Sequence, residues 1–346
     1  MSPTGPPLHD LRPDIAKDDA FDIAIENLLE YSLVKRKATS LATCDSFWVH
    51  PVVHQWARER VNEDEQRANA GEAISLITTA VATQSAKRDT KYWEFERRIS
   101  NHIDLCSQNI SKYYHSAANE YPANLLQSLS TLGEINSFRG DLERSMDCYQ
   151  RALDGTEKAL GKDHPKTLST VHYLAGLFKS RGEYDKAIEW YQRTLDGREK
   201  ALGKDHPDTL TTVHNLAGLF ESRGEYDTAI EWYQRALDGR EKALGKDHPE
   251  TLTTVHYLAG LFKSRGEYDK AIEWYQRALD GREKTLGKDH PKTLSTVHYL
   301  AGLFKSRGEY DKAIEWYQRA LAGREKALGK DHPDTLSTVH CLASIR

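Results

Sequence analysis

Residues 164–205 read HPKTLSTVHYLAGLFKSRGEYDKAIEWYQRTLDGREKALGKD, and this 42-residue unit decides the fold because it recurs. Three copies follow without a gap, at 206–247, 248–289 and 290–331, and they differ from the first at only six, four and two positions. A truncated copy occupies 332–346, and 123–163 align as a diverged first copy. A period of this size is typical of solenoids, in which each unit packs on the next. We therefore expect function on an extended surface rather than in an enclosed pocket.

The hydrophobic pattern predicts two helices in each unit. Apolar residues recur at three- and four-residue spacing in two stripes, first at Leu168, Val171, Leu174, Ala175 and Phe178, and then at Tyr184, Ala187, Ile188, Tyr191 and Leu195. Gly182 separates the stripes, and Gly203 and Pro207 mark the end of one unit and the start of the next. One hairpin cannot bury both stripes, but stacked copies can. The pattern predicts an all-α solenoid.

These residues also identify a family resemblance. The order Leu174, Ala175, Phe178, Gly182, Tyr184, Ala187 and Tyr191 resembles the tetratricopeptide repeat, whose usual period is about 34 residues. The longer unit, with its GREKALGKDHP tail, is similar to the repeats of kinesin light chains and to the repeat tails of fungal and bacterial signalling NTPases. The resemblance covers 123–346. It implies a right-handed α-solenoid of stacked helical hairpins that binds a protein or peptide partner in a concave groove.

The resemblance also implies which side chains line that groove. They stand at four positions of the first helix: Ser169, His172, Tyr173 and Lys179, then Thr211, His214, Asn215 and Glu221, then Thr253, His256, Tyr257 and Lys263, then Ser295, His298, Tyr299 and Lys305. Asn215 in place of Tyr173, and Glu221 in place of Lys179, are two of the six differences between the first two units. The differences fit either diversification of a groove or drift on a solvated face.

Two repeated series invite a chemical interpretation. The histidines His172, His214, His256, His298 and His340 suggest a pH-sensitive series, and the tryptophans Trp190, Trp232, Trp274 and Trp316 suggest stacking against a ligand. Both series recur because the unit recurs, and large aromatic side chains dominate buried contacts in repeats. We favour packing for both.

Residues 1–120 carry no repeat. We divide them into three segments instead. Pro3, Pro6 and Pro7 predict a disordered start at 1–20, and 63–120 are predicted to form a helical spacer. At 21–62, FWVHPVVHQWARERV resembles the winged-helix end of a fungal NB-ARC-type signalling NTPase. The resemblance places His50 on a Met-His-Asp motif, where it would be a vestigial nucleotide sensor; Pro51 departs from that motif.

Other site chemistry finds little support. The stretch Gly197–Gly203 has five residues between its glycines instead of the four of a phosphate loop, so we expect no cofactor. His50 and His54 lack a third ligand, so we expect no metal. A net charge of −4 gives no basic surface for nucleic acid. Without a leader pattern, an apolar run of about 18 residues or paired cysteine motifs, the chain is expected to be cytoplasmic and free of membrane.

The sequence therefore predicts a non-enzymatic interaction module. The first interpretation is the ligand-sensing or autoinhibitory repeat tail of an NB-ARC-type signalling protein whose nucleotide-binding domain lies elsewhere. The alternative is a free-standing scaffold or cargo adaptor resembling kinesin light chains. Leu336, Val339 and Leu342 of the truncated copy are expected to pack backward on the preceding unit. The far side of that copy is expected to stay uncovered, which predicts self-association through the C-terminal repeat.

Overall fold

The structure is a computed structural model that describes residues 34–37, 46–49, 62–85, 90–114, 121 and 123–345. The expected disordered start at 1–20 lies outside these residues, as does most of the expected winged-helix-like segment at 21–62. His50, Pro51 and His54 are also outside, so the interpretation of His50 as a nucleotide sensor stays a prediction.

The N-terminal part contains a short β-hairpin. Strand β1 (Val34–Lys37) pairs with β2 (Ser46–Val49) in antiparallel register, with Val34 opposite Val49 and Lys37 opposite Ser46. This two-stranded sheet is the exception to an otherwise helical fold among the described residues.

Two long helices, α3 (Glu63–Ser85) and α4 (Thr90–Tyr113), pack on the start of the repeat array. Ile74 of α3 and Ile103 of α4 share one buried cluster with Leu129 of the first repeat helix. The Asp104 carboxylate also accepts hydrogen bonds from Arg139, at 3.2 Å, and Arg144, at 2.8 Å. The expected spacer is thus in direct contact with the first hairpin.

The prediction of stacked helical hairpins is confirmed. The diverged first copy forms α5 (Ala123–Phe138) and α6 (Leu142–Leu160). The four near-identical units form α7 (Pro165–Ser180) and α8 (Tyr184–Leu202), α9 (Pro207–Ser222) and α10 (Tyr226–Leu244), α11 (Pro249–Ser264) and α12 (Tyr268–Leu286), and α13 (Pro291–Ser306) and α14 (Tyr310–Leu328). The truncated copy is α15 (Pro333–Ala343).

Helix ends follow from the residues at the unit boundary. In α9, Pro207 takes the first turn, where its missing N–H is not needed, and His206 Nδ1 accepts a hydrogen bond from the Asp208 N–H at 3.1 Å. The preceding helix ends at Gly203, whose φ of 93° is a conformation that side chains with a Cβ rarely adopt. The same histidine cap begins α7, α11, α13 and α15. It was not predicted from the sequence, because histidine is not a usual cap residue.

The core is built from residues of consecutive units. One cluster joins Ala217 of α9 and Tyr233 of α10 to Val255 and Leu258 of α11, all at most 1% exposed. The predicted stripes are therefore buried by their own hairpin and by its neighbour. Stability of this kind is approximately a sum over units and the contacts between them.

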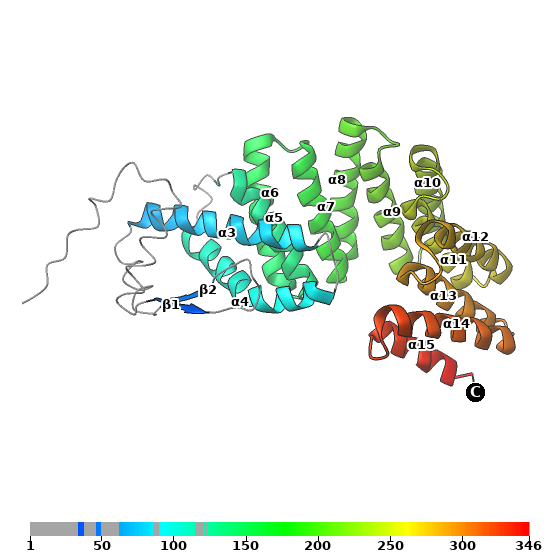
Figure 1. The fold of residues 1–346 in the computed structure, drawn as a ribbon. Coiled ribbons are helices and arrows are strands. Elements are labelled where there is room, and N and C mark those ends of the chain that lie inside the picture. The colour runs from blue at the N-terminus through cyan, green and yellow to red at the C-terminus, as the bar shows by residue number, and fades with distance from the viewer. Residues whose placement is uncertain are drawn as a thin grey trace, which may run out of the picture.

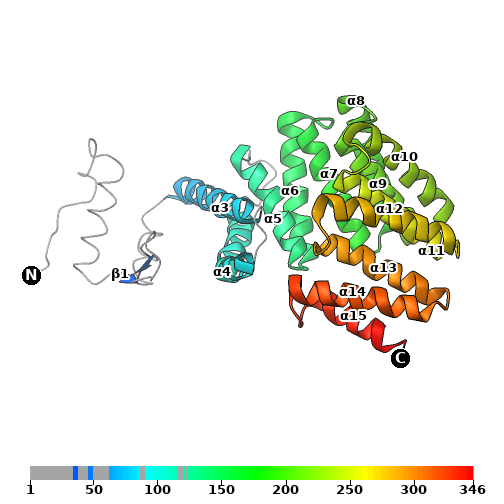
Figure 2. The same cartoon turned by 45° about the vertical axis from the view of Figure 1, so that its right-hand side comes forward.

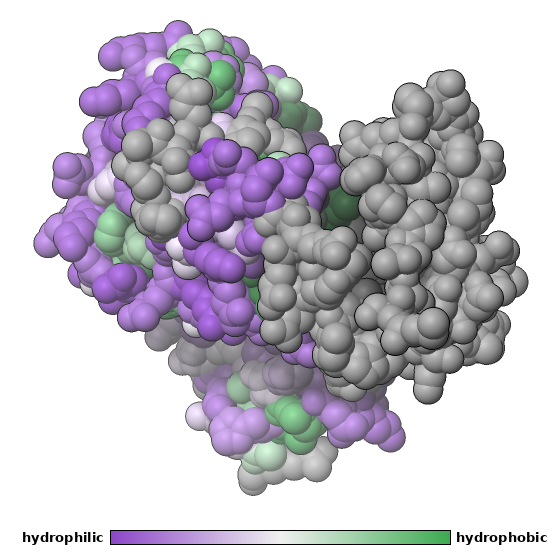
Figure 3. Space-filling model, turned by 90° about the vertical axis from the view of Figure 1, so that its left-hand side faces the viewer, coloured by the Kyte–Doolittle hydropathy of each residue, from purple (hydrophilic) through white to green (hydrophobic). Residues whose placement is uncertain are grey.

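The hairpins stand side by side in a row that curls, so that α13, α14 and α15 lie below α9 to α12 (Figures 1 and 2). In the view of Figure 3, the described residues present mainly hydrophilic surface with small, separate hydrophobic patches. No single broad apolar face stands out among the described residues in that view.

The expectation that Leu336 and Val339 pack backward is wrong. They are 53% and 43% exposed on α15, and only Leu342 is buried against the preceding unit. The reason lies in the complete units, where Leu168 occupies the position of Leu336 and packs on Gly197 of the second helix of its own hairpin. The leucine position therefore faces the second helix of its own hairpin rather than the unit before. The valine position does pack on the unit before in the complete units, as Val255 does on Ala217 and Tyr233, but Val339 stays 43% exposed and outside the cluster that buries Leu342.

Candidate functional site on the first-helix face

The structure places the predicted groove residues on α7, α9, α11 and α13, and we call their common side the first-helix face. The serine and threonine members and the lysine and glutamate members are half-buried. The tyrosines are the most open, with Tyr173, Tyr257 and Tyr299 at 46%, 43% and 47% exposed. The histidines, by contrast, lie between aromatic rings. The predicted set therefore separates into an aromatic surface and a layer beneath it.

Each exposed tyrosine is supported from below by buried rings. Tyr299 stacks on Tyr275 of the preceding unit, with centroids 6.2 Å apart and planes 7° from parallel. His256 meets both rings edge-on, at 5.1 Å and 5.0 Å. Tyr257 stacks in the same way on Tyr233. These contacts hold the exposed rings in a fixed orientation along the first-helix face.

The histidines of this layer are neutral at physiological pH. Burial, together with a nearby arginine, lowers the pKa of His172, His214 and His256 to about 3, and that of His298 to about 4. A series that titrates so far from neutrality does not sense pH in the physiological range. Their edge-on contacts agree with the packing interpretation.

The tryptophans lie on the second helices and also pack. Trp274 is partly buried against the clusters on both sides of it, with the Phe262 ring at 6.0 Å and the Arg277 guanidinium 5.5 Å from its centroid. The same arrangement recurs at Trp232. Each of these indoles packs between its own hairpin and the hairpins on both sides, as the packing interpretation expected.

The second unit departs from this aromatic series at two places. Asn215 stands where the other units have tyrosine, and its Nδ2 lies 3.0 Å from His172 Nε2. Two turns further along α9, Glu221 accepts a hydrogen bond from the Tyr233 hydroxyl at 3.1 Å and faces Lys179. Burial raises the pKa of Glu221 and lowers that of Lys179, and each charge opposes the shift of the other. The sign change at Glu221 therefore neutralises a half-buried lysine of the neighbouring unit.

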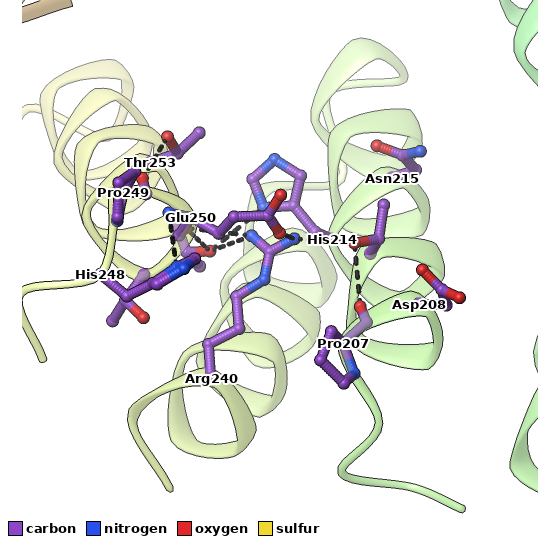
Figure 4. Close-up of polar contacts among 12 residues, drawn as sticks. Pro207, Asp208, His214, Asn215, Arg240, His248, Pro249, Glu250 and Thr253 are labelled. Carbon is purple, nitrogen blue, oxygen red and sulfur yellow. Dashed lines mark hydrogen bonds and ion pairs between the residues drawn. The ribbon is translucent and has the colours of Figure 1, made fainter. Parts of the chain in front are cut away.

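Four arginines that the sequence analysis did not single out cross the contact between each unit and the next. We call Arg198, Arg240, Arg282 and Arg324 the junction arginines; all are buried. In Figure 4, Arg240 rises from α10 between α9 and α11. Its Nη1 donates to the Glu250 carbonyl at 3.1 Å and to Thr254 Oγ1 at 2.8 Å, and its Nη2 donates to Thr211 Oγ1 at 3.2 Å. One guanidinium thus ties three helices together, next to the first-helix face.

We call the contact between one unit and the next a junction. The four junctions that contain a junction arginine differ in the acidic residue beside it. Glu250 pairs with Arg240 at 2.9 Å, and Asp208 and Asp334 occupy the same helix position beside Arg198 and Arg324. The junction between α12 and α13 has Lys292 at that position. Burial lowers the pKa of all four junction arginines, and it lowers that of Arg282 to about 10. A carboxylate offsets the shift at the other three junctions but not at this one.

Three other interpretations of the sequence, a phosphate loop, a metal site and a membrane span, can be compared with the structure. The stretch from Gly197 to Gly203 closes the α8 helix, and Gly197 is buried against Leu168, so it is a helix end rather than a phosphate loop. Across the described ranges, no group of three His, Cys, Asp or Glu side chains is arranged to hold a metal ion. Nor does any helix in those ranges have the length and apolar character needed to cross a bilayer.

Comparison with known proteins identifies the family. The tetratricopeptide repeat matches residues 124–200, 169–242, 208–284, 250–326 and 295–345. The chain therefore belongs to the tetratricopeptide-repeat family, as its repeat pattern and its helical hairpins indicate. No curated protein matches the sequence.

Solved structures give a second comparison. Nearly identical TPR-like repeats from Podosopora anserina, described as a kinesin light chain, are 25% identical to this chain, with a TM-score of 0.51, covering 59% of this chain and 96% of that one. A variant of the same repeats gives 25% identity and a TM-score of 0.51 over 58% and 95%. BtubC (BKLC) from P. vanneervenii is 21% identical, with a TM-score of 0.53 over 79% and 94%, which supports the fold alone. The array is thus similar to kinesin-light-chain-like repeats.

Proposed function

We propose that this protein is a non-enzymatic interaction module whose first-helix face binds an extended segment of a protein partner. The observation that carries the proposal is the set of exposed rings at Tyr173, Tyr257 and Tyr299, each held by buried rings beneath it. Tyrosine is enriched at the centres of protein interfaces, because it combines a large apolar ring with a hydrogen-bonding hydroxyl.

The preset orientation of these rings supports binding in a second way. A side chain that is already fixed loses little conformational freedom when a partner docks, so more of the contact free energy remains as affinity. The units also keep almost every core residue while changing positions 215 and 221 on this face. Such changes alter which partner fits without disturbing the solenoid.

Two alternative roles can be proposed for the module. The similarity to kinesin-light-chain repeats favours a scaffold or adaptor that holds a peptide or protein in its groove. The resemblance of 21–62 to a winged helix instead favours the ligand-sensing or autoinhibitory tail of an NB-ARC-type signalling protein, in the cytoplasm. A phosphate loop in the same gene product would favour the second role, and an N-terminal heptad coiled coil would favour the first.

Binding can be tested with an array of random 12-residue peptides and matched tyrosine variants. We expect Tyr257→Ser to reduce peptide binding at least tenfold, because it removes one of the preset rings from the first-helix face. Tyr310→Ser is the control, since Tyr310 is 55% exposed but lies on a second helix. Equal loss in both variants, or no loss in either, would refute the assignment of this face. Failure of the wild-type protein to bind any peptide would count against peptide binding altogether.

A further inference from the structure

We propose that ion pairs on the second helices set the angle between consecutive units, so that the array changes its curvature with ionic strength. The second helices are α8, α10, α12 and α14, and the ion pairs cross from each of them to the unit before. This response would occur whether or not a peptide is bound, so it goes beyond the proposed function.

Three kinds of ion pair connect consecutive units along the second helices, and we call them the bridging pairs. One lies at the turn before the second helix, one at the middle of the helix and one at its last turn. For α10 they are Arg223–Asp185 at 2.9 Å, Arg235–Glu199, and Lys242–Asp205 at 2.5 Å. The next two junctions repeat all three, as Arg265–Asp227, Arg277–Glu241 and Lys284–Asp247, and then as Arg307–Asp269, Arg319–Glu283 and Lys326–Asp289.

The bridging pairs lie along open grooves. A groove of about 690 Å³ runs beside α10, and Asp205 and Lys242, which pair with each other, both line it. Grooves of about 620 Å³ and 570 Å³ lie beside α12 and α8 and are lined by the equivalent residues. Because this space is not filled by side chains, consecutive second helices can move apart here without losing apolar contacts.

The same units are joined by close packing nearer the first helices. Tyr257 of α11 stacks on Tyr233 with ring centroids 5.8 Å apart, and Thr254 Oγ1 lies 3.4 Å from His214 Nδ1. Trp232, which lies beneath the Arg235 guanidinium, packs into the core of the unit before. Opening this layer would expose apolar surface, which is costly. A change of angle between units should therefore pivot about the packed layer and widen the grooves.

Dissolved salt reaches the bridging pairs more easily than the packed layer. The side chains of Asp185 and Lys242 are 93% and 73% exposed. An exposed ion pair contributes little by itself, because holding two long side chains costs entropy, and salt weakens it further. The Debye length falls from about 10 Å at 0.1 M salt to about 3 Å at 1 M. As the ionic strength rises, we expect the second helices to separate while the first helices keep their spacing, which changes the bend of the row of exposed tyrosines.

The chain offers two matched sets of six carboxylates. One set forms the bridging pairs of the two junctions between α8 and α12, and its variant carries Asp185→Asn, Asp205→Asn, Asp227→Asn, Asp247→Asn, Glu199→Gln and Glu241→Gln. The control set has its partners inside its own unit, and its variant carries Asp196→Asn, Asp238→Asn, Asp280→Asn, Glu183→Gln, Glu225→Gln and Glu267→Gln. Both variants change the net charge equally, and circular dichroism should show the same helicity for both.

The spacing of the helices can be measured by double electron–electron resonance. Spin labels on unnatural side chains at the exposed positions of Glu189 and Glu273 report on α8 and α12, and labels at Ser180 and Ser264 report on α7 and α11. Dilution with unlabelled protein restricts the measurement to distances within one chain. At 0.1 M salt, the bridging-pair variant should lengthen the 189–273 distance by about 6 Å, since a water between the charges adds about 3 Å at each of two junctions.

The other arms of the experiment separate the proposal from general loosening. Wild type at 1 M salt should lengthen the 189–273 distance partway, the control variant should leave it unchanged, and the 180–264 distance should stay the same throughout. An unchanged 189–273 distance in the bridging-pair variant, an equal increase in the control variant, or an equal increase for both label pairs would overturn the proposal. A wild-type distance that is the same at 0.1 M and 1 M salt would also overturn it, and this arm needs no charge variant. None of these results depends on peptide binding, so the proposed function is tested separately.

Discussion

Substitution of alanine for Gly281 and for Gly260, both in the third unit, should change the stability of the protein in opposite directions. A Cβ on Gly281 would lie 2.5 Å and 2.8 Å from the two methyl carbons of Leu252, which is itself 1% exposed. Carbon atoms prefer a separation of about 3.5–4.0 Å, so the side chain of Leu252 or the helix must move. A Cβ on Gly260 would meet only the Tyr275 hydroxyl, at 3.4 Å. The two sites share a unit and differ mainly in the space beside them.

The expected change in the free energy of unfolding is the sum of two contributions. Replacing glycine by alanine inside a helix stabilises it by about 1 kcal/mol, and this gain applies to both sites. Overpacking a buried site costs about 1–3 kcal/mol, and the near-complete burial of Leu252 places Gly281 toward the upper end. We therefore expect Gly281→Ala to destabilise the protein by about 1–2 kcal/mol and Gly260→Ala to stabilise it by up to about 1 kcal/mol.

Urea denaturation followed by circular dichroism at 222 nm measures both effects. Repeat arrays need not unfold in one step, so the comparison should use the transition midpoints of the two variants under one set of conditions. The reasoning fails if Gly281→Ala is as stable as wild type, or if Gly260→Ala loses more than about 1 kcal/mol.

Two further predictions concern the stability of the protein at acid pH and its self-association. Because burial lowers the pKa of His256 to about 3, from about 6.5 in the unfolded chain, its contribution to stability is complete above pH 6.5. It is lost as the pH falls toward 3, at up to about 1.4 kcal/mol per pH unit. Urea midpoints at pH 7, 6 and 5 should therefore fall more slowly for His256→Phe, and parallel slopes would contradict this. The exposed Leu336 and Val339 should make the chain of residues 1–346 self-associate through α15, by contact with a second copy. Sedimentation at several concentrations should show a monomer for Leu336→Lys/Val339→Lys, and a wild-type protein that is monomeric throughout would reject the idea.

The helical hairpins were predictable because each depends on local pattern. The stripe containing Leu174 and Ala175 has the helical period, and Gly182, Gly203 and Pro207 mark the ends of helices that the structure places within a few residues of them. The tyrosine positions were implied by the resemblance to tetratricopeptide repeats, which assigns Tyr173, Tyr257 and Tyr299 to the groove-lining side of the first helix.

The junction arginines could not be predicted in the same way. On a helical wheel Arg198 lies in a charged segment and has the pattern of a solvated residue. Its partners, the Asp208 carbonyl and Thr212 Oγ1, are 10 and 14 residues later, beyond a turn, on the next helix. Local spacing of three or four residues shows no sign of them. The outward position of Leu336 escaped prediction for a related reason, because its usual neighbour is a helix that follows it in the chain.

The repetition of the same junction from α8 to α15 also has a consequence for the length of the protein. Removing 248–289 would bring α13 directly after α10, where it would meet Arg240, Tyr233 and Leu237 in the geometry that α11 now uses. Inserting one more unit would repeat the same kind of cluster at each of its two contacts. Copy number is therefore a variable that the fold tolerates. Gain or loss of whole units would lengthen or shorten the binding face in steps of one hairpin without requiring any new packing solution.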